Sequence, residues 1–144
     1  MPPIGNLLTY CVSHSIVYRM VKAAPGTAPG GIPDETIEKL TLELRRGVIV
    51  LACLSQLDEP SYGYELQQRL AARGMEIEQG TLYPLLRRLE EQRLLGEEWI
   101  VEGSRPRKYY RLTDAGKRAR AELEEQWNAM SAVLDALLAP THGG

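Results

Sequence analysis

The chain has 144 residues, of which 44% are apolar and 25% are charged, and its formal net charge is −2. These values are typical of one globular domain with its own core, and they exclude a largely disordered chain. The weakly negative net charge gives no global sign of a nucleic-acid partner, so evidence for one has to be local.

The cysteines and histidines offer no obvious catalytic or metal-binding group. Cys11 and Cys53 have no companions at disulfide or metal-ligand spacing, which favours a reduced, cytoplasmic setting. Cys53 lies in an apolar run, where we expect inert packing. His14 and His142 lie near opposite ends of the chain. Because the sequence also carries no phosphate-binding glycine loop, we expect no enzyme activity, no cofactor and no metal.

Residues 1–33 are expected to form a poorly ordered extension outside the folded domain. Residues 4–21 are interrupted by polar side chains, so they suit neither a membrane span nor a secretory signal. Residues 23–33 read AAPGTAPGGIP, a composition typical of a linker. A functional N-terminal arm is the alternative.

Residues 34–57 are predicted to be helical and to begin a domain that extends to residue 112. Asp34 is a candidate N-cap, and Gly47 is a candidate bend or break in the helix. After it, residues 48–57 are nearly all apolar, which predicts burial on several sides. A second helix is expected after Ser61 as its N-cap, with Tyr62, Leu66 and Leu70 on one face.

A third helix is predicted over residues 80–92. Its leucines recur at the spacing of one buried stripe (Leu82, Leu85, Leu86 and Leu89). The opposite side carries Arg87 and Glu91, and Pro84 is expected in about the first turn, because further in it would break the hydrogen-bond ladder.

Two short strands are predicted over residues 95–101 and 108–112, with a turn at residues 102–106. Tyr109 and Tyr110 alternate along the second strand, so one is expected to pack inward and the other to be available to a phosphate. A last helix, residues 113–139, starts with Thr113 and Asp114 as capping residues. Its apolar positions follow the 4, 3, 4, 3 spacing of a coiled-coil seam (Leu123, Trp127, Met130, Leu134 and Leu137).

Three helices followed by a hairpin is the order of a winged helix-turn-helix, so the expected fold is mainly α with a small β-hairpin. In such folds the third helix enters the major groove. Residues 103–120 carry seven basic residues and one acid, enough local charge to neutralise phosphates. The candidate DNA contacts are Thr81, Tyr83, Pro84, Arg87, Arg88, Arg105, Arg107, Lys108 and Tyr109, with Arg87 the candidate for reading a base edge.

Three segments resemble the PadR family of winged-helix regulators. They are YGYEL at residues 62–66, GTLYPLLRRLE at 80–90 and RPRKYYRLTDAG at 105–116. The resemblance implies a homodimer that binds DNA, often a repressor relieved by a small molecule. Trp127 falls where some members have an interface tryptophan that stacks on flat aromatic ligands.

The function predicted from the sequence is therefore a cytoplasmic, sequence-specific, DNA-binding transcriptional regulator with double-stranded DNA and a second copy as its partners. A small aromatic effector at Trp127 is a further candidate partner, and no membrane partner is expected. The dimer is expected to form through the last helix, helped by Leu40 and Leu44 in the first. A protein-interaction module and a non-specific architectural DNA binder are the alternatives.

Overall fold

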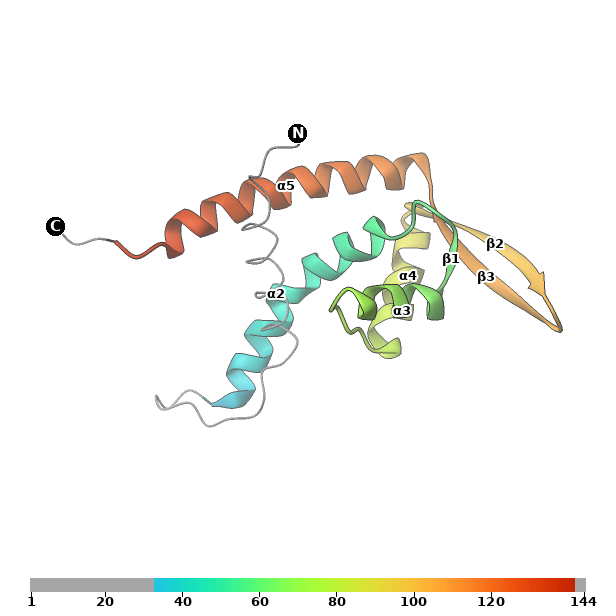
Figure 1. Ribbon diagram of the computed structural model, residues 1–144, viewed down its shortest axis with the longest axis horizontal. Coiled ribbons are helices and arrows are strands. Elements are labelled where there is room, and N and C mark those ends of the chain that lie inside the picture. Colours follow the sequence, from blue (N-terminus) through green and yellow to red (C-terminus); the bar gives the residue numbers. More distant parts are fainter. Residues whose placement is uncertain (1–32, 142–144) are drawn as a thin grey trace, which may run out of the picture.

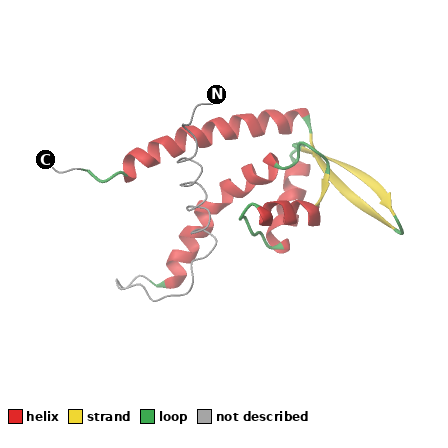
Figure 2. Ribbon diagram, in the orientation of Figure 1, coloured by secondary structure: helices red, strands yellow, loops and turns green. Residues whose placement is uncertain are grey.

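The computed structural model describes residues 33–141, and in this part the chain forms four helices and one three-stranded antiparallel sheet. The mainly helical fold with a small hairpin is confirmed (Figure 2). Residues 1–32, Cys11, His14 and His142 lie outside the described residues, so the predicted extension does too. The elements are α2 (Asp34–Ser55), β1 (Ser61–Tyr62), α3 (Gly63–Ala72), α4 (Gln79–Glu91), β2 (Leu95–Glu102), β3 (Arg105–Leu112) and α5 (Asp114–Leu138).

Helix α2 is less interrupted than its composition suggests, and it ends earlier than predicted. Pro33, and not Asp34, occupies the N-cap position, and Asp34 is the first helical residue, where its charge still favours the helix dipole. Gly47 neither divides nor ends the helix. The cost of a glycine in a helix is only about 1 kcal/mol, and burial of Cys53 and Leu54 one to two turns later more than offsets it. The helix ends at Ser55 instead of residue 57.

The prediction that Ser61 caps a helix is wrong. Ser61 and Tyr62 form the short strand β1, which pairs with Tyr110 and Tyr109 of β3. The hydroxyl of Ser61 donates to the Glu65 carboxylate at 3.0 Å. Tyr62 has an extended backbone ahead of α3, so it does not share a helix face with Leu66 as expected.

The core lies where α2, α3, α4 and the base of the sheet meet. Its fully buried side chains include Leu54, Leu57, Leu66, Leu82 and Leu86. Leu112 ties the sheet to this core, because its amide donates to the Leu57 carbonyl at 3.2 Å. The leucine stripe predicted for α4 is buried as expected, which fixes the direction in which the opposite face of α4 points.

Strands β2 and β3 form a hairpin with a turn of only two residues, so the predicted five-residue turn is wrong. Gly103 lies at φ +69°, a conformation that tight hairpin turns require and glycine adopts without strain. Pro106 lies within β3, opposite Val101. It is tolerated because β1 pairs with β3 only at residues 109 and 110, which leaves the other side of Pro106 without a neighbouring strand.

Parts of two helices and the hairpin extend away from this compact part (Figure 1). The N-terminal part of α2 and the C-terminal part of α5 project on one side, and the β2–β3 hairpin projects on the other.

As predicted, the hydroxyl of Thr113 caps α5 by accepting from the Gly116 amide at 3.0 Å. In the described range 33–141, every helix is too short or too polar to cross a membrane.

Candidate nucleic-acid interface

Helices α3 and α4 form the helix-turn-helix, joined by the segment from residue 73 to residue 78. The face of α4 opposite the leucine stripe is solvent-exposed. It consists of Gly80, Thr81, Tyr83, Pro84, Arg87, Arg88 and Glu91. All five α4 residues predicted to contact DNA therefore lie on one accessible surface, which has the size and chemistry for a major groove.

Pro84 lies inside α4, close to its start. The helix begins at Gln79 and continues unbroken to Glu91, so Pro84 is at the beginning of its second turn. A proline there lacks the amide that would bond to the Gly80 carbonyl. Gly80 is exposed, with nothing within 4 Å of the position of a Cβ, so this turn of the helix is open to solvent.

Tyr83 links the two helices of the motif. Its ring lies against Gly63, the first residue of α3, so closely that a Cβ on Gly63 would be 2.6 Å from Tyr83 Cε1. Tyr83 is still 40% exposed. The glycine of the YGYEL segment therefore makes room for the tyrosine of the GTLYP segment, and this contact sets the orientation of the tyrosine hydroxyl on the outer surface.

Arg87 is a highly accessible basic group on α4. Its guanidinium lies 3.2 Å from the Glu91 carboxylate, and the two side chains are 80% and 65% exposed. An ion pair this exposed contributes at most about 1 kcal/mol. Arg87 can therefore exchange Glu91 for a base edge or a phosphate at little cost, while Glu91 opposes phosphate approach near the end of the helix.

Lys108 occupies a different environment from the one expected of a DNA contact. Its ammonium lies 2.8 Å from the Glu90 carboxylate of α4 and 2.6 Å from the Glu97 carboxylate of β2. Hydrogen bonds to these two carboxylates, Glu90 first, raise the pKa of Lys108 well above its ordinary value. Because its charge is already matched, Lys108 mainly joins the recognition helix to the hairpin.

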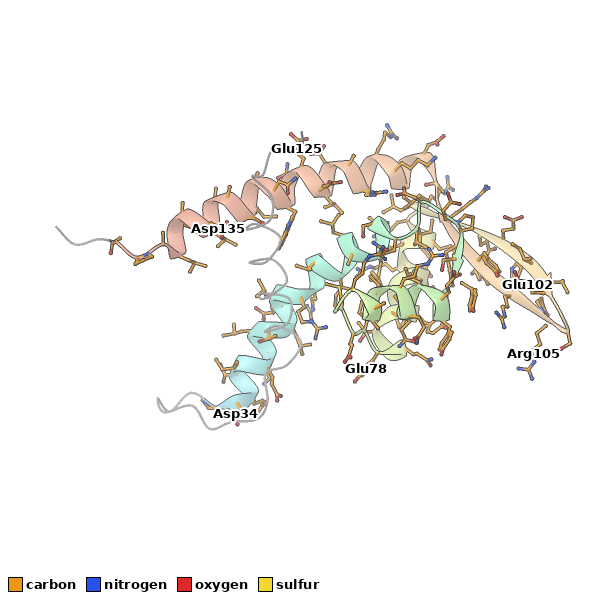
Figure 3. All side chains as sticks on the ribbon, in the orientation of Figure 1. Asp34, Glu78, Glu102, Arg105, Glu125 and Asp135 are labelled. Atoms are coloured by element: carbon orange, nitrogen blue, oxygen red, sulfur yellow. The ribbon has the colours of Figure 1, made fainter. Side chains whose placement is uncertain are left out.

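The predicted basic patch is thus divided by the fold. Lys108 is paired with two acids, and Arg120 forms an ion pair with Asp58. Arg105 stays exposed at the hairpin tip, next to Glu102 (Figure 3). Arg107 lies over the Tyr62 ring, 4.6 Å from its centroid, and remains partly exposed. The exposed basic groups are therefore spread over the hairpin end, the base of β3 and the start of α5, where Arg111, Lys117 and Arg118 are exposed as well.

The expectation that one of Tyr109 and Tyr110 faces outward is wrong. Both are buried, with exposed fractions of 9% and 8%. Tyr110 packs into the core, while Tyr109 meets the edge of the Tyr62 ring at 5.5 Å and donates its hydroxyl to Glu102 at 2.9 Å. Strand β1 brings Tyr62 over the face that would otherwise be open, so Tyr109 positions the hairpin and is poorly placed to touch DNA.

A second surface, formed by α2 and α5, is apolar and unpartnered in the single chain. The predicted seam residues are between 37% and 73% exposed on α5. Leu40 and Leu44 of α2 are 56% and 55% exposed. Apolar surface of this extent on two projecting helices is typical of an interface between subunits.

Four structural features of this surface are not indicated by the sequence patterns. Gly63, Glu90 and Glu97 act through partners that lie far away in the chain, and no local pattern indicates such pairs. Trp99 lies in a segment that is predicted only as a strand, and its exposure becomes apparent only in the structure.

Comparison with known proteins agrees with this geometry. Residues 50–122 match the model of a protein family described as "Transcriptional regulator PadR-like family". A transcriptional regulator of Mycobacterium tuberculosis is 40% identical over 81 residues, which span 56% of this chain and 76% of that protein.

Two solved structures also share the fold. The crystal structure of a PadR family transcriptional regulator from Eggerthella lenta is 51% identical, with a TM-score of 0.68 over 75% of this chain and 96% of that chain. A PadR-like transcriptional regulator from Bacillus cereus is 30% identical, with a TM-score of 0.62 over 68% and 98% of the two chains. The chain belongs to the PadR-like family of transcriptional regulators, which are DNA-binding proteins and not enzymes.

Proposed function

We propose that the protein is a sequence-specific repressor that binds its operator as a homodimer and is released by a small aromatic effector. The observation that carries the proposal is the outer face of α4. Its leucine stripe is locked into the core, and Arg87 on the other side is 80% exposed. A rigid helix with a solvent-exposed guanidinium matches the bidentate recognition of guanine in the major groove.

The dimer is proposed to form through the apolar surface of α2 and α5. Two charges placed on the seam, Met130→Asp with Leu134→Asp, should dissociate it, because two copies of each carboxylate would face apolar side chains. Asn128→Asp with Ala132→Asp is the matched control, since 100° per residue places these positions on the opposite face of α5. Sedimentation velocity at several protomer concentrations measures the result. A seam variant that dimerises as tightly as the control would contradict the assignment.

DNA recognition is tested by fluorescence anisotropy with the duplex upstream of the protein's own gene and a scrambled duplex, over a salt series. Arg87→Ala should lower affinity for the upstream duplex by about tenfold or more, as loss of a bidentate base contact does. Lys39→Ala removes a positive charge from the far end of α2, where Lys39 pairs with Glu35, and should leave affinity unchanged. Equal losses on both duplexes would favour non-specific, phosphate-dominated binding.

The effector is proposed to stack on Trp127, which is 44% exposed on the seam of α5. Binding there would alter the pairing of the two α5 helices and so the spacing of the two α4 helices, which weakens DNA binding. The Trp99→Phe variant leaves Trp127 as the sole tryptophan of the chain. A planar aromatic compound that quenches the fluorescence of Trp127 should lower the affinity of the protein for DNA. Bound DNA should lower the affinity of the protein for the compound by the same factor. Quenching without any change in DNA affinity would contradict the coupling.

A further inference from the structure

A hollow of about 800 Å³ lies between α2 and the helix-turn-helix. Its walls come from α2, α3, the segment between α3 and α4, and the first turn of α4. Of its lining residues, only Thr81 also lies on the exposed face of α4 described above. A hollow of this volume has the size of a small-molecule site, and neither DNA recognition nor the α5 seam accounts for it.

Leu42 gives the hollow an apolar wall that the proposed dimer surface does not use. A rotation of 100° per residue places Leu42 about 160° from both Leu40 and Leu44 around α2, so it points to the other side of the helix. It is nevertheless 57% exposed. The other apolar residues of the lining are Ile49, Ala71 and Ile77. The hollow can therefore bury the apolar part of a ligand.

Two hydrogen bonds hold the walls of the hollow in place. The Arg45 guanidinium on α2 donates to the Glu76 carbonyl oxygen at 3.0 Å. The Gln67 amide on α3 donates to the Ile77 carbonyl oxygen at 2.8 Å. Both helices thus fix the segment that precedes α4, so the hollow exists before any ligand arrives and little ordering is needed on binding.

The charged residues of the hollow form two sets of opposite sign. Helix α2 contributes Arg45 and Arg46, and the segment before α4 contributes Glu76 and Glu78, of which Figure 3 labels Glu78 at the end of the helix-turn-helix away from α5. Within residues 33–141, these four side chains form no ion pair with each other or with other residues. An anion would be repelled by the glutamates and a cation by the arginines, whereas a ligand with one charge of each sign matches both sets.

We propose that the hollow binds a short zwitterionic peptide of about two or three residues with apolar side chains. Its carboxylate would pair with Arg46, its amino group with Glu76 and Glu78, and its side chains would cover Leu42. The exposed amide of Gln68 lines the hollow between the charged walls and can both donate to and accept from a peptide unit. An extended tripeptide is about 10 Å long, which suits a hollow of this volume.

The test is isothermal titration calorimetry of the full chain with trileucine and with N-acetyl-trileucine, which keeps the carboxylate but lacks the amino charge. Arg46→Gln should weaken the binding of both peptides by about fivefold, as loss of an exposed ion pair does. Glu76→Gln combined with Glu78→Gln should weaken trileucine by a similar factor and leave the acetylated peptide unaffected. Leu42→Ala should weaken both peptides alike, because it removes apolar contact area.

The matched controls are Arg118→Gln, and Glu124→Gln combined with Glu125→Gln. These residues are exposed on α5, which contributes nothing to the lining of the hollow, so the affinity for both peptides should not change. Circular dichroism confirms that each variant is folded. No binding of trileucine at millimolar concentration would overturn the inference. Binding that the hollow variants leave unchanged, or that the double glutamine variant weakens equally for both peptides, would overturn it as well.

Discussion

Gly116 is the position where the addition of a single methyl group should destabilise the fold most. A Cβ on Gly116 would lie 2.0 Å from the Leu94 carbonyl oxygen and 3.2 Å from Leu112 Cδ2. The nearest atom belongs to the backbone and would have to retreat by about 1 Å, because real Cβ atoms essentially never come closer than 3.0 Å. The same carbonyl accepts from the amide and the hydroxyl of Thr113, both at 3.1 Å.

Gly116→Ala should therefore lower the free energy of unfolding by about 3–5 kcal/mol. Overpacking costs about 1–3 kcal/mol, and each weakened hydrogen bond adds about 1 kcal/mol. For a domain of this size the melting temperature should fall by about 10–20 °C. Far-UV circular dichroism measures the melting temperature at one protein concentration, since the stability of an oligomer would depend on concentration. Gly80→Ala, where nothing lies within 4 Å, is the control and should melt within about 3 °C of wild type. A Gly116→Ala protein that also does so would refute the reasoning.

Three further predictions follow from single contacts. Thr113→Ala should lower the free energy of unfolding, measured in urea, by about 1–2 kcal/mol because α5 loses its N-cap. Thr113→Ser, which keeps the capping hydroxyl, should retain most of the wild-type stability. Gly63→Ala should displace the Tyr83 ring, and lower DNA affinity severalfold with little change in melting temperature; unchanged affinity would mean that Tyr83 does not contact DNA. Lys108→Met should destabilise the fold at neutral pH but progressively less in acid. The hydrogen bond from Lys108 lowers the pKa of Glu97 below its ordinary 4.5, so its contribution is full above pH 4.5 and is lost as pH falls through the lowered value. A destabilisation that is constant from pH 7 to about pH 3 would contradict that linkage.

Local periodicity predicts the helices well where one face is buried. The leucines of α4 and the cap at Thr113 depend on neighbours within one or two turns, which the sequence displays directly. Strand β1 is not predicted because two residues are too few to show the alternation of a strand. Its pairing with β3 also involves residues almost 50 positions away in the chain. Without that pairing, Ser61 resembles an ordinary helix cap.

The candidate site is predicted in outline but not in its electrostatics. Counting basic residues along the chain treats Lys108 and Arg105 as equal, whereas the fold places two carboxylates around Lys108 and none as close to Arg105. Glu90 and Glu97 lie 18 and 11 positions from Lys108, beyond the reach of any helix or strand period. The prediction for Tyr109 fails through the same kind of contact, because its cover comes from Tyr62 across the sheet.

The central claim is that two copies of α4 read one operator in register. Selection of bound duplexes from a random-sequence library tests it most directly, because the operator need not be identified beforehand. The account predicts an enriched inverted repeat whose half-sites lie one helical turn, about 10 base pairs, or a multiple of it apart. It also predicts that the enrichment at one base pair per half-site is lost with Arg87→Ala. Binding without enrichment of any sequence, or enrichment of a single half-site, would contradict it.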